Sequence, residues 1–149
     1  MPGEKTFTVI NPIPGQPDQN DPVNHGCCVA SKVAGPQFGV AKNVNVVMLR
    51  LPFPANPDEF LDAAHVMTAL FEVYSSVMSR GLRKKAVVNM SLGCKYINPT
   101  IGKLGLTSTL VFLDQNSPVL FSIRYWIDKL IENDVVIVAA SGNTRVRVF

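Results

Sequence analysis

Three short stretches of the chain combine residue types that could do chemistry. One is a histidine that opens a run of small residues, and the other two are apolar segments that end in small and polar residues. Histidine titrates near neutrality and can act as a general base. Small residues let a substrate backbone approach, and an asparagine amide can donate to a developing negative charge. The candidate residues are His25; Ser91, Leu92 and Gly93; and Ala139, Ala140, Ser141 and Asn143.

Apolar runs and helical repeats predict the elements that position these residues. The strand candidates are apolar with little polar alternation, which is typical of strands covered on both faces. Strand, helix, strand, helix, strand predicts two right-handed βαβ crossovers and a parallel sheet, an α/β fold. In such sheets ligands bind beyond the carboxyl ends of the strands. The predicted strands are 44–51, 86–91 and 134–140, and the predicted helices are 25–34, 57–80 and 117–132.

The two longer helices carry start signals and apolar stripes. Asn56 suits the cap of the first, with Pro57 at its first position and Glu59 completing a capping box. In the second helix, Ser117 suits the cap and Pro118 the first position. Residues three and four apart share one helix face. The predicted stripes are Phe60, Ala64, Met67, Phe71, Tyr74 and Met78 in one helix, and Phe121, Ile123, Trp126, Ile127, Leu130 and Ile131 in the other.

Composition narrows the function classes. Of the 149 residues, 47% are hydrophobic and 17% are charged, which is a globular composition. The net charge of +3 is small and scattered, so a nucleic-acid partner is not expected. Four basic residues are interpreted as cations near the carboxyl end of a helix, where the carbonyl groups favour positive charge. They are Arg80, Arg83, Lys84 and Lys85. No apolar run reaches the length of a membrane span, and residues 1–10 lack the features of a signal peptide, so the compartment stays open.

The cysteines and the second histidine are given structural interpretations. Three cysteines, two of them adjacent, do not make a disulfide framework. Cys28 beside His25 could be a thiolate nucleophile, but a buried small residue is the favoured interpretation. Because consecutive cysteines point to different sides of a helix, no zinc site with His25 is expected, and neither a metal nor a cofactor is predicted. His65 is interpreted as a surface or hydrogen-bonded residue.

Three ordered blocks carry a resemblance to a known family. His25-Gly26-Cys27-Cys28-Val29-Ala30-Ser31, continuing through Phe38-Gly39-Val40-Ala41-Lys42-Asn43, resembles the histidine block of subtilisin-like (family S8) peptidases, closest to proteinase-K-like members. Val88-Asn89-Met90-Ser91-Leu92-Gly93 resembles their substrate-binding strand. Val136-Ile137-Val138-Ala139-Ala140-Ser141-Gly142-Asn143 resembles the strand that ends in the oxyanion-hole asparagine. The blocks cover residues 21–51, 86–93 and 118–143.

The resemblance implies roles residue by residue. His25 would be the general base, and Asn143 would donate to the oxyanion of the tetrahedral intermediate. Ser91 and Gly93, with Leu92 between them, would offer backbone hydrogen bonds to an extended peptide. The pocket for the residue before the scissile bond would be lined by Ala139, Ala140 and Ser141. The fold would be part of a subtilisin-like three-layer fold, a parallel β-sheet flanked by helices, and the partner a polypeptide substrate or inhibitor.

Other parts of the sequence depart from the family pattern. The family's aspartate block is a strand followed by Asp-[Ser/Thr]-Gly, and the nearest match is Thr8-Val9-Ile10-Asn11, with Asn where Asp belongs. The nucleophile block, Gly-Thr-Ser-Met-Ala, is absent from residues 1–149. Residues 1–20 are predicted to be irregular, and residues 94–116 are interpreted as an insertion. A truncated or misread gene is one hypothesis for this pattern.

Two functions follow from these matches and departures. The first is a partial catalytic domain over residues 1–149 of a serine endopeptidase, inactive alone because two members of the triad are missing. The second is a non-catalytic, protease-like remnant that holds extended peptides or an inhibitor. A nucleotide-binding α/β protein is disfavoured because no glycine-rich phosphate motif follows any predicted strand. The family is often secreted, but this sequence does not assign a compartment.

Overall fold

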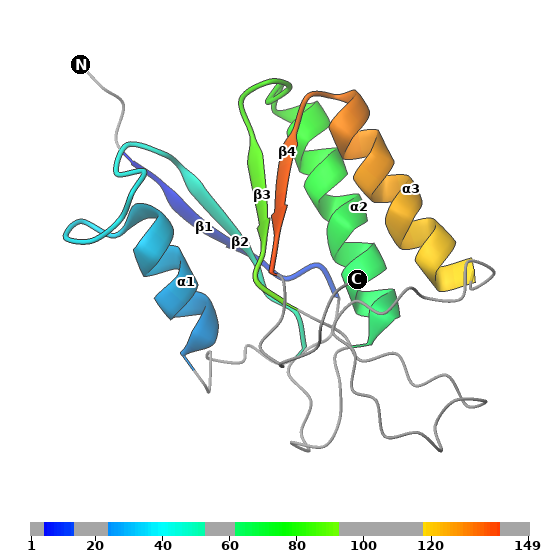
Figure 1. Ribbon diagram of the computed structural model, residues 1–149, viewed down its shortest axis with the longest axis horizontal. Helices are drawn as coiled ribbons and strands as arrows, with labels where there is room; N and C mark the ends of the chain where they lie inside the picture. The colour runs from blue at the N-terminus through cyan, green and yellow to red at the C-terminus, as the bar shows by residue number, and fades with distance from the viewer. Residues whose placement is uncertain (1–4, 14–23, 53–61, 93–117, 141–149) are drawn as a thin grey trace, which may run out of the picture. The chain divides into compact units, whose positions relative to one another are not determined.

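The protein is known from a computed structural model that describes residues 5–13, 24–52, 62–92 and 118–140 (Figure 1). The chain divides into two compact units, Met1–Pro52 and Phe53–Phe149, which are described separately below. Helices and parallel strands occur in both, so the predicted α/β class is confirmed. The strands form two parallel pairs rather than one three-stranded sheet among the described residues.

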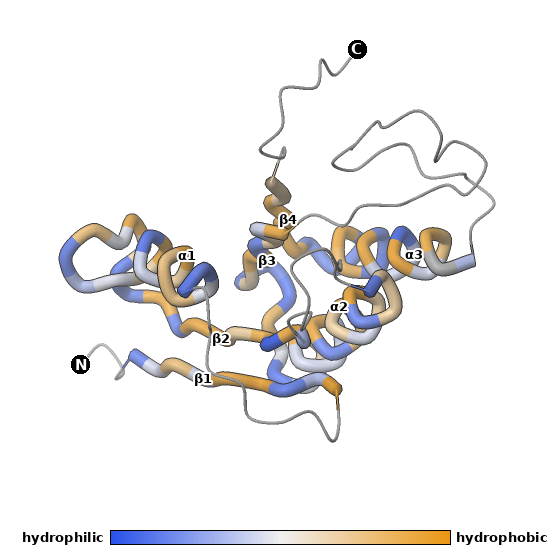
Figure 2. The backbone as a smooth tube through the Cα atoms, turned by 90° about the horizontal axis from the view of Figure 1, so that it is seen from below, coloured by the Kyte–Doolittle hydropathy of each residue, from blue (hydrophilic) through white to orange (hydrophobic). Residues whose placement is uncertain are grey.

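The first unit contains β1 (Phe7–Ile10), α1 (His25–Ala34) and β2 (Val46–Leu49). The two strands pair in parallel, from Phe7 opposite Val46 to Ile10 opposite Leu49. Figure 2 colours both strands largely as hydrophobic. The prediction that residues 1–20 are irregular is therefore wrong at β1. A four-residue strand beside a proline-rich stretch offers too short a pattern for periodicity to reveal.

Hydrogen bonds outside the strand ladder hold the start of this pair. Asn45 lies directly before β2, and its side-chain Oδ1 accepts from the backbone nitrogen of Thr6 at 3.0 Å and from the Thr6 hydroxyl at 3.1 Å. One side chain thus ties the start of β2 to the start of β1. The predicted strand 44–51 and helix 25–34 both lie where expected.

The second unit contains α2 (Ala63–Ser79), β3 (Val87–Met90), α3 (Pro118–Glu132) and β4 (Val136–Ala139). Strands β3 and β4 pair in parallel, and α3 lies between them in sequence, which makes a βαβ unit. The two helices lie side by side (Figure 1). Trp126 of α3 packs against Phe71 and Tyr74 of α2, with ring centroids 5.1 Å and 5.4 Å apart.

Helix α2 begins later than predicted. Asp62 has an extended backbone (φ −66°, ψ 129°), and its carboxylate accepts from the backbone nitrogen of Ala64 at 2.9 Å, so it is the N-cap. The predicted start of this helix at residue 57 is therefore wrong, because Asp62 caps α2 and is not itself helical. The predicted capping signals at residues 56, 57 and 59 lie outside the described residues. Residues 94–116 and Ser117, interpreted above as an insertion and a cap, lie outside them as well.

The buried faces of both helices differ from the predicted stripes. In α2 the most buried residues are Val66, Ala69, Leu70 and Val77. In the predicted stripe of α2, Phe71 is 45% exposed, and its ring contacts α3 instead. In α3 Leu130 is fully buried, but Phe121 and Ile131 are 70% and 56% exposed. An apolar helix surface wider than one stripe leaves the sequence ambiguous about which side is innermost.

The β3–β4 pair has one exposed apolar face. The exposed side chains Val87, Val136 and Val138 all lie on it. Val87 stands opposite Val136 in the register, and Val138 stands opposite Asn89. The prediction that these strands are covered on both faces is therefore wrong for this pair among the described residues.

Candidate functional site

The carboxyl ends of β3 and β4 lie side by side. Met90 is opposite Ala139, and the backbone nitrogen of Ala140 donates to the carbonyl oxygen of Met90 at 3.1 Å. This bond extends the parallel ladder one residue beyond β4. It brings the residues after β3, Ser91 and Leu92, to the same edge as Ala139 and Ala140.

Exposure at this edge differs between the two strands. Ser91 and Leu92 are half-buried, whereas Ala139 and Ala140 are exposed. The side-chain amide of Asn89 donates to the Ser91 hydroxyl at 2.9 Å, which orients that hydroxyl. Of the residues predicted for this site, these four are brought together. Gly93, Ser141 and Asn143 lie outside the described residues.

The strand ends carry no ionisable side chain. Residues 86–93 and 135–143 contain only apolar, small, hydroxyl and amide residues. This edge can therefore bind by shape and by backbone hydrogen bonds, but it has no acid or base of its own. Proton transfer at this edge would need a titratable group from another segment.

His25 is the first residue of α1 and is exposed. The preceding Asn24 has a left-handed backbone (φ 53°, ψ 21°), a conformation that asparagine tolerates better than most residues. The first helical hydrogen bond runs from the backbone nitrogen of Cys28 to the carbonyl oxygen of Asn24 at 3.0 Å. The chain thus turns sharply into α1 and places the histidine at its amino end, as predicted from the sequence.

Cys27 and Cys28 are both exposed. The interpretation of Cys28 as a buried small residue is therefore wrong. The first turn of α1 buries little: residues 25–28 are exposed, and the buried residue of this helix is Ala34 at its carboxyl end. Within the described residues, no group of three or more His, Cys, Asp or Glu side chains gathers as metal ligands do.

Backbone contacts hold the far end of α1. The backbone nitrogens of Gly35, Val40 and Ala41 donate to carbonyl oxygens of the helix at 2.9, 3.2 and 2.8 Å. The Lys5 ammonium also donates to the carbonyl oxygen of Ala34. Gly39 lies so close to the helix end that a Cβ there would stand 2.4 Å from the backbone nitrogen of Gly35. The segment after α1 therefore folds back on the helix and fixes its direction.

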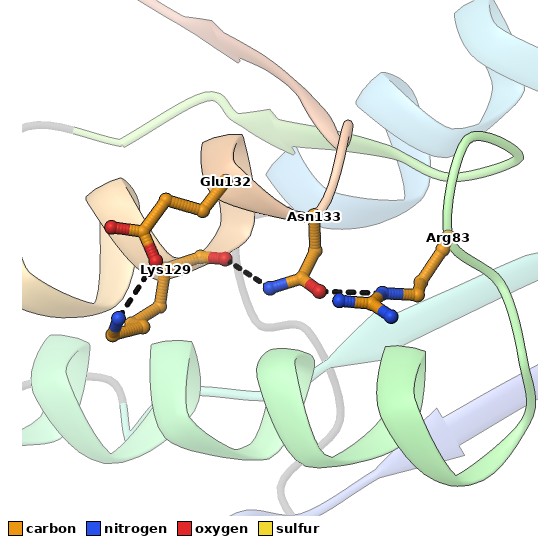
Figure 3. A network of polar contacts seen from close by, with 4 residues as sticks. All are labelled: Arg83, Lys129, Glu132 and Asn133. Atoms are coloured by element: carbon orange, nitrogen blue, oxygen red, sulfur yellow. Dashed lines mark hydrogen bonds and ion pairs between the residues drawn. The ribbon is translucent and has the colours of Figure 1, made fainter.

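A polar network holds the opposite end of the β3–β4 pair (Figure 3). The Asn133 side chain is 6% exposed; its oxygen accepts from Arg83 Nε at 2.5 Å, and its nitrogen donates to the carbonyl oxygen of Lys129 at 2.7 Å. Lys84 and Asp134, which follow these two residues, both have left-handed backbones (φ 62° and 56°). Their side chains approach to 3.9 Å.

This network was missed in the sequence. Arg83 and Lys84 were interpreted as cations at a helix end, but α2 ends at Ser79 and both side chains contact the turn before β4. The available signal was the Asn133-Asp134 pair between a helix and a strand, since both residue types favour turns and tolerate left-handed backbone. That signal predicts a turn but not its partner, which lies 50 residues away.

Lys129 has the one resolved electrostatic shift in the described part of the chain. Its ammonium donates to the Glu132 carboxylate at 2.7 Å. This hydrogen bond and the attraction between the two charges raise the pKa of Lys129 above its usual value of 10.5. Glu132 is exposed and Lys129 half-buried, and the pair contributes no group to the strand ends.

No helix in the described ranges is both long and apolar enough to cross a bilayer. No family model matches the chain. No solved structure matches it either.

Curated proteins with similar sequences share one description. The chain is 35% identical over 94 residues to Subtilisin-like protease 3 of Pseudogymnoascus destructans, covering 63% of this chain and 22% of that protein. It is 35% identical over 79 residues to Subtilisin-like serine protease Pen ch 13 of Penicillium rubens, covering 53% and 19%. It is 32% identical over 91 residues to Subtilisin-like protease 2 of Trichophyton rubrum, covering 58% and 20%.

The chain spans about a fifth of the length of the curated relatives it matches. The identities are similar in all three, and the matches extend over more than half of this chain. Over that part, the chain is related in sequence to subtilisin-like serine proteases.

Proposed function

We propose that residues 1–149 form part of the catalytic domain of a subtilisin-like serine endopeptidase, with the base and the peptide-binding strands but without the nucleophile. His25 would take the proton of a serine supplied by another segment. Asn143 would stabilise the oxyanion of the tetrahedral intermediate. The relationship to subtilisin-like proteases supports this assignment.

The structural observation that carries the proposal is that the carboxyl ends of β3 and β4 lie together. An extended peptide can bind to a sheet as an added strand, by hydrogen bonds between its backbone and the unpaired side of an existing strand. Ser91, Leu92 and Gly93 would pair with such a peptide, and Ala139, Ala140 and Ser141 would line the pocket for the residue before the scissile bond. The Ala140–Met90 hydrogen bond supports this by holding the two strand ends together.

The chain alone is expected to be inactive. The sequence contains neither the Asp-[Ser/Thr]-Gly block before His25 nor a Gly-Thr-Ser block. Without the serine no acyl-enzyme forms, and without the aspartate the imidazole is not held in the required tautomer. The interpretation of residues 94–116 as an insertion remains a proposal of the same kind.

The test is labelling with a fluorophosphonate probe, which reacts with activated serines, together with hydrolysis of a fluorogenic peptide. We expect labelling and hydrolysis by the product of the complete reading frame and neither by residues 1–149. In the complete product, His25→Ala is expected to lower kcat by about 10⁶-fold. The chain has two histidines, so His65→Ala on α2 is the matched control and should leave kcat unchanged.

Two results would contradict the proposal. Peptide hydrolysis by residues 1–149 that disappears in His25→Ala would show that the chain needs no further segment. Absence of labelling in both proteins, combined with saturable binding of an extended peptide, would support the non-catalytic peptide-binding alternative.

A further inference from the structure

The exposed face of β3 and β4 specifies the register of this pair only weakly. Val87 faces Val136 on the exposed face, and Val88 faces Ile137 on the other. A slip of two residues keeps every side chain on its own face. It would place Val138 instead of Val136 opposite Val87, and Ala139 instead of Ile137 opposite Val88. The exposed face keeps a Val–Val pair in both registers, so a contact outside the strands can add to the choice between them.

Asn133 provides such an interaction. Among the described residues, Asn133 is the polar residue that is buried, with an exposed fraction of 6%. Its oxygen accepts from Arg83 at 2.5 Å, while its nitrogen donates to the carbonyl oxygen of Lys129 at 2.7 Å (Figure 3). A buried amide that loses one of its partners carries the full cost of desolvation. The contact with Arg83 is therefore strongly preferred over any arrangement that breaks it.

The position of this contact couples it to the register. Arg83 and Asn133 each lie a few residues before the strand that follows them, β3 and β4 respectively. The first bond of the ladder runs from the backbone nitrogen of Val136 to the carbonyl oxygen of Ala86 at 3.3 Å. A slip of two residues would move β4 by about 6.6 Å along β3, which a hydrogen bond cannot accommodate.

We propose that the Arg83–Asn133 hydrogen bond fixes the register of β3 against β4, which makes Asn133 a positioning residue for the strand ends that carry Ser91 and Ala140. The consequence for peptide binding rests on the proposed function. The register itself does not, because it is a property of this chain alone.

Cross-linking between cysteines measures the register directly. Cys27, Cys28 and Cys94 are first replaced by serine. One reporter then carries Val87→Cys and Val136→Cys, which face each other in the observed register; the other carries Val87→Cys and Val138→Cys, which face each other after a slip. Facing residues on neighbouring strands lie about 4.8 Å apart, within disulfide reach, whereas the offset pair lies about 8 Å apart, beyond it.

The expected result is a change in the ratio of the two cross-linked products. Without further substitution the first reporter closes and the second does not. Asn133→Ala, and separately Arg83→Ala, should shift the ratio towards the slipped pair by about tenfold, since about 1.4 kcal/mol corresponds to tenfold and a hydrogen bond to a charged group contributes at least that. Lys85→Ala is the matched control, an exposed cation on the same turn, and should leave the ratio unchanged.

Arg83→Ala decides the matter if Asn133→Ala fails to fold, because Arg83 is exposed and its removal leaves the apolar core intact. A ratio unchanged within about twofold, the scale of ordinary surface substitutions, would overturn the proposal even if the melting temperature falls. The ratio does not depend on hydrolysis. A failure of the proposed peptidase function and a failure of this inference are therefore separate results.

Discussion

The two units of the chain share one plan, a strand, a helix and a parallel strand, but they hold their helices by different means. In the described part of the first unit the buried residues are small or cyclic, namely Pro12, Ala34, Gly35 and Gly39, and backbone hydrogen bonds fix the end of α1. In the second, the buried side chains are mostly large and apolar, among them Val66, Leu70, Val77 and Leu130. One unit is thus fixed mainly by close backbone contact and the other by side-chain burial.

As a result, the candidate catalytic and binding residues are not the buried residues that stabilise the fold most. His25 lies at the exposed end of a helix whose buried residue, Ala34, is at the other end. Ser91 and Ala140 lie at strand ends, whereas the fully buried Leu130 accepts the backbone hydrogen bond that begins the turn into β4. Substitutions at the candidate site are therefore expected to affect folding less than substitutions of the buried apolar residues of the second unit.

The largest expected effect is that of Leu130→Ala. Leu130 is fully buried, so truncation removes apolar contacts and leaves a cavity that should cost about 2–5 kcal/mol. Urea unfolding followed by the fluorescence of Trp126, the one tryptophan of the chain, measures the loss. Ile131→Ala, next to it and 56% exposed, is the control and should cost about 1 kcal/mol or less. Equal losses would mean that the second unit does not depend on side-chain burial.

The next effect tests the first unit by contrasting two glycines. A Cβ at Gly39 would lie 2.6 Å from the carbonyl carbon of Ala34, so Gly39→Ala must displace backbone at a cost of about 1–3 kcal/mol. Gly81 has φ 62° with no atom within 4 Å of the added Cβ, so Gly81→Ala should cost only the left-handed conformation, about 1–2 kcal/mol.

Hydrogen exchange locates these two effects. The backbone nitrogen of Ala41 donates to the carbonyl oxygen of Val33 at 2.8 Å, and its protection should fall in Gly39→Ala and not in Gly81→Ala. Unchanged protection of Ala41 in the first variant would show that backbone contact does not hold α1.

The smallest effect concerns the Lys129–Glu132 pair. Because the pKa of Lys129 is raised by its hydrogen bond to Glu132, the pair stabilises the folded chain below pH 10.5 and loses that contribution as the pH rises through the raised pKa. The Glu132 side chain is 58% exposed and the Lys129 side chain 34%, so water and salt reach the pair and screen the interaction. Thermal melts of Glu132→Gln and the parent protein should nearly coincide on both sides of that pH. A large difference confined to lower pH would contradict this.

Sequence patterns were sufficient for the elements of the second βαβ unit. The β-branched runs at β3 and β4 and the Pro118 start of α3 gave their positions closely. The same patterns did not predict which side chains are exposed, because a run such as Val136–Ala139 has the same composition whether one face of the strand or both are covered. They also missed β1, which is four residues long.

For the candidate site, sequence placed each residue at an element end but could not supply the contacts between segments. His25 was correctly expected to open a helix, and Ser91 to follow a strand. The Arg83–Asn133 and Asn45–Thr6 hydrogen bonds join residues 50 and 39 positions apart, and no local pattern encodes such partners. Long-range polar contacts are thus where the sequence is least informative.

The location of the Arg83–Asn133 contact, at the amino ends of β3 and β4, has a consequence for how readily the site can change. The residues that set the alignment of the strands are not those that would touch a ligand. New side chains at Ser91 or Ala140 can therefore be selected for what they bind without also having to preserve the alignment. Laboratory evolution confined to the carboxyl ends of these strands should accept a broad range of residues, which makes these strand ends the place to start in altering the proposed recognition of peptides.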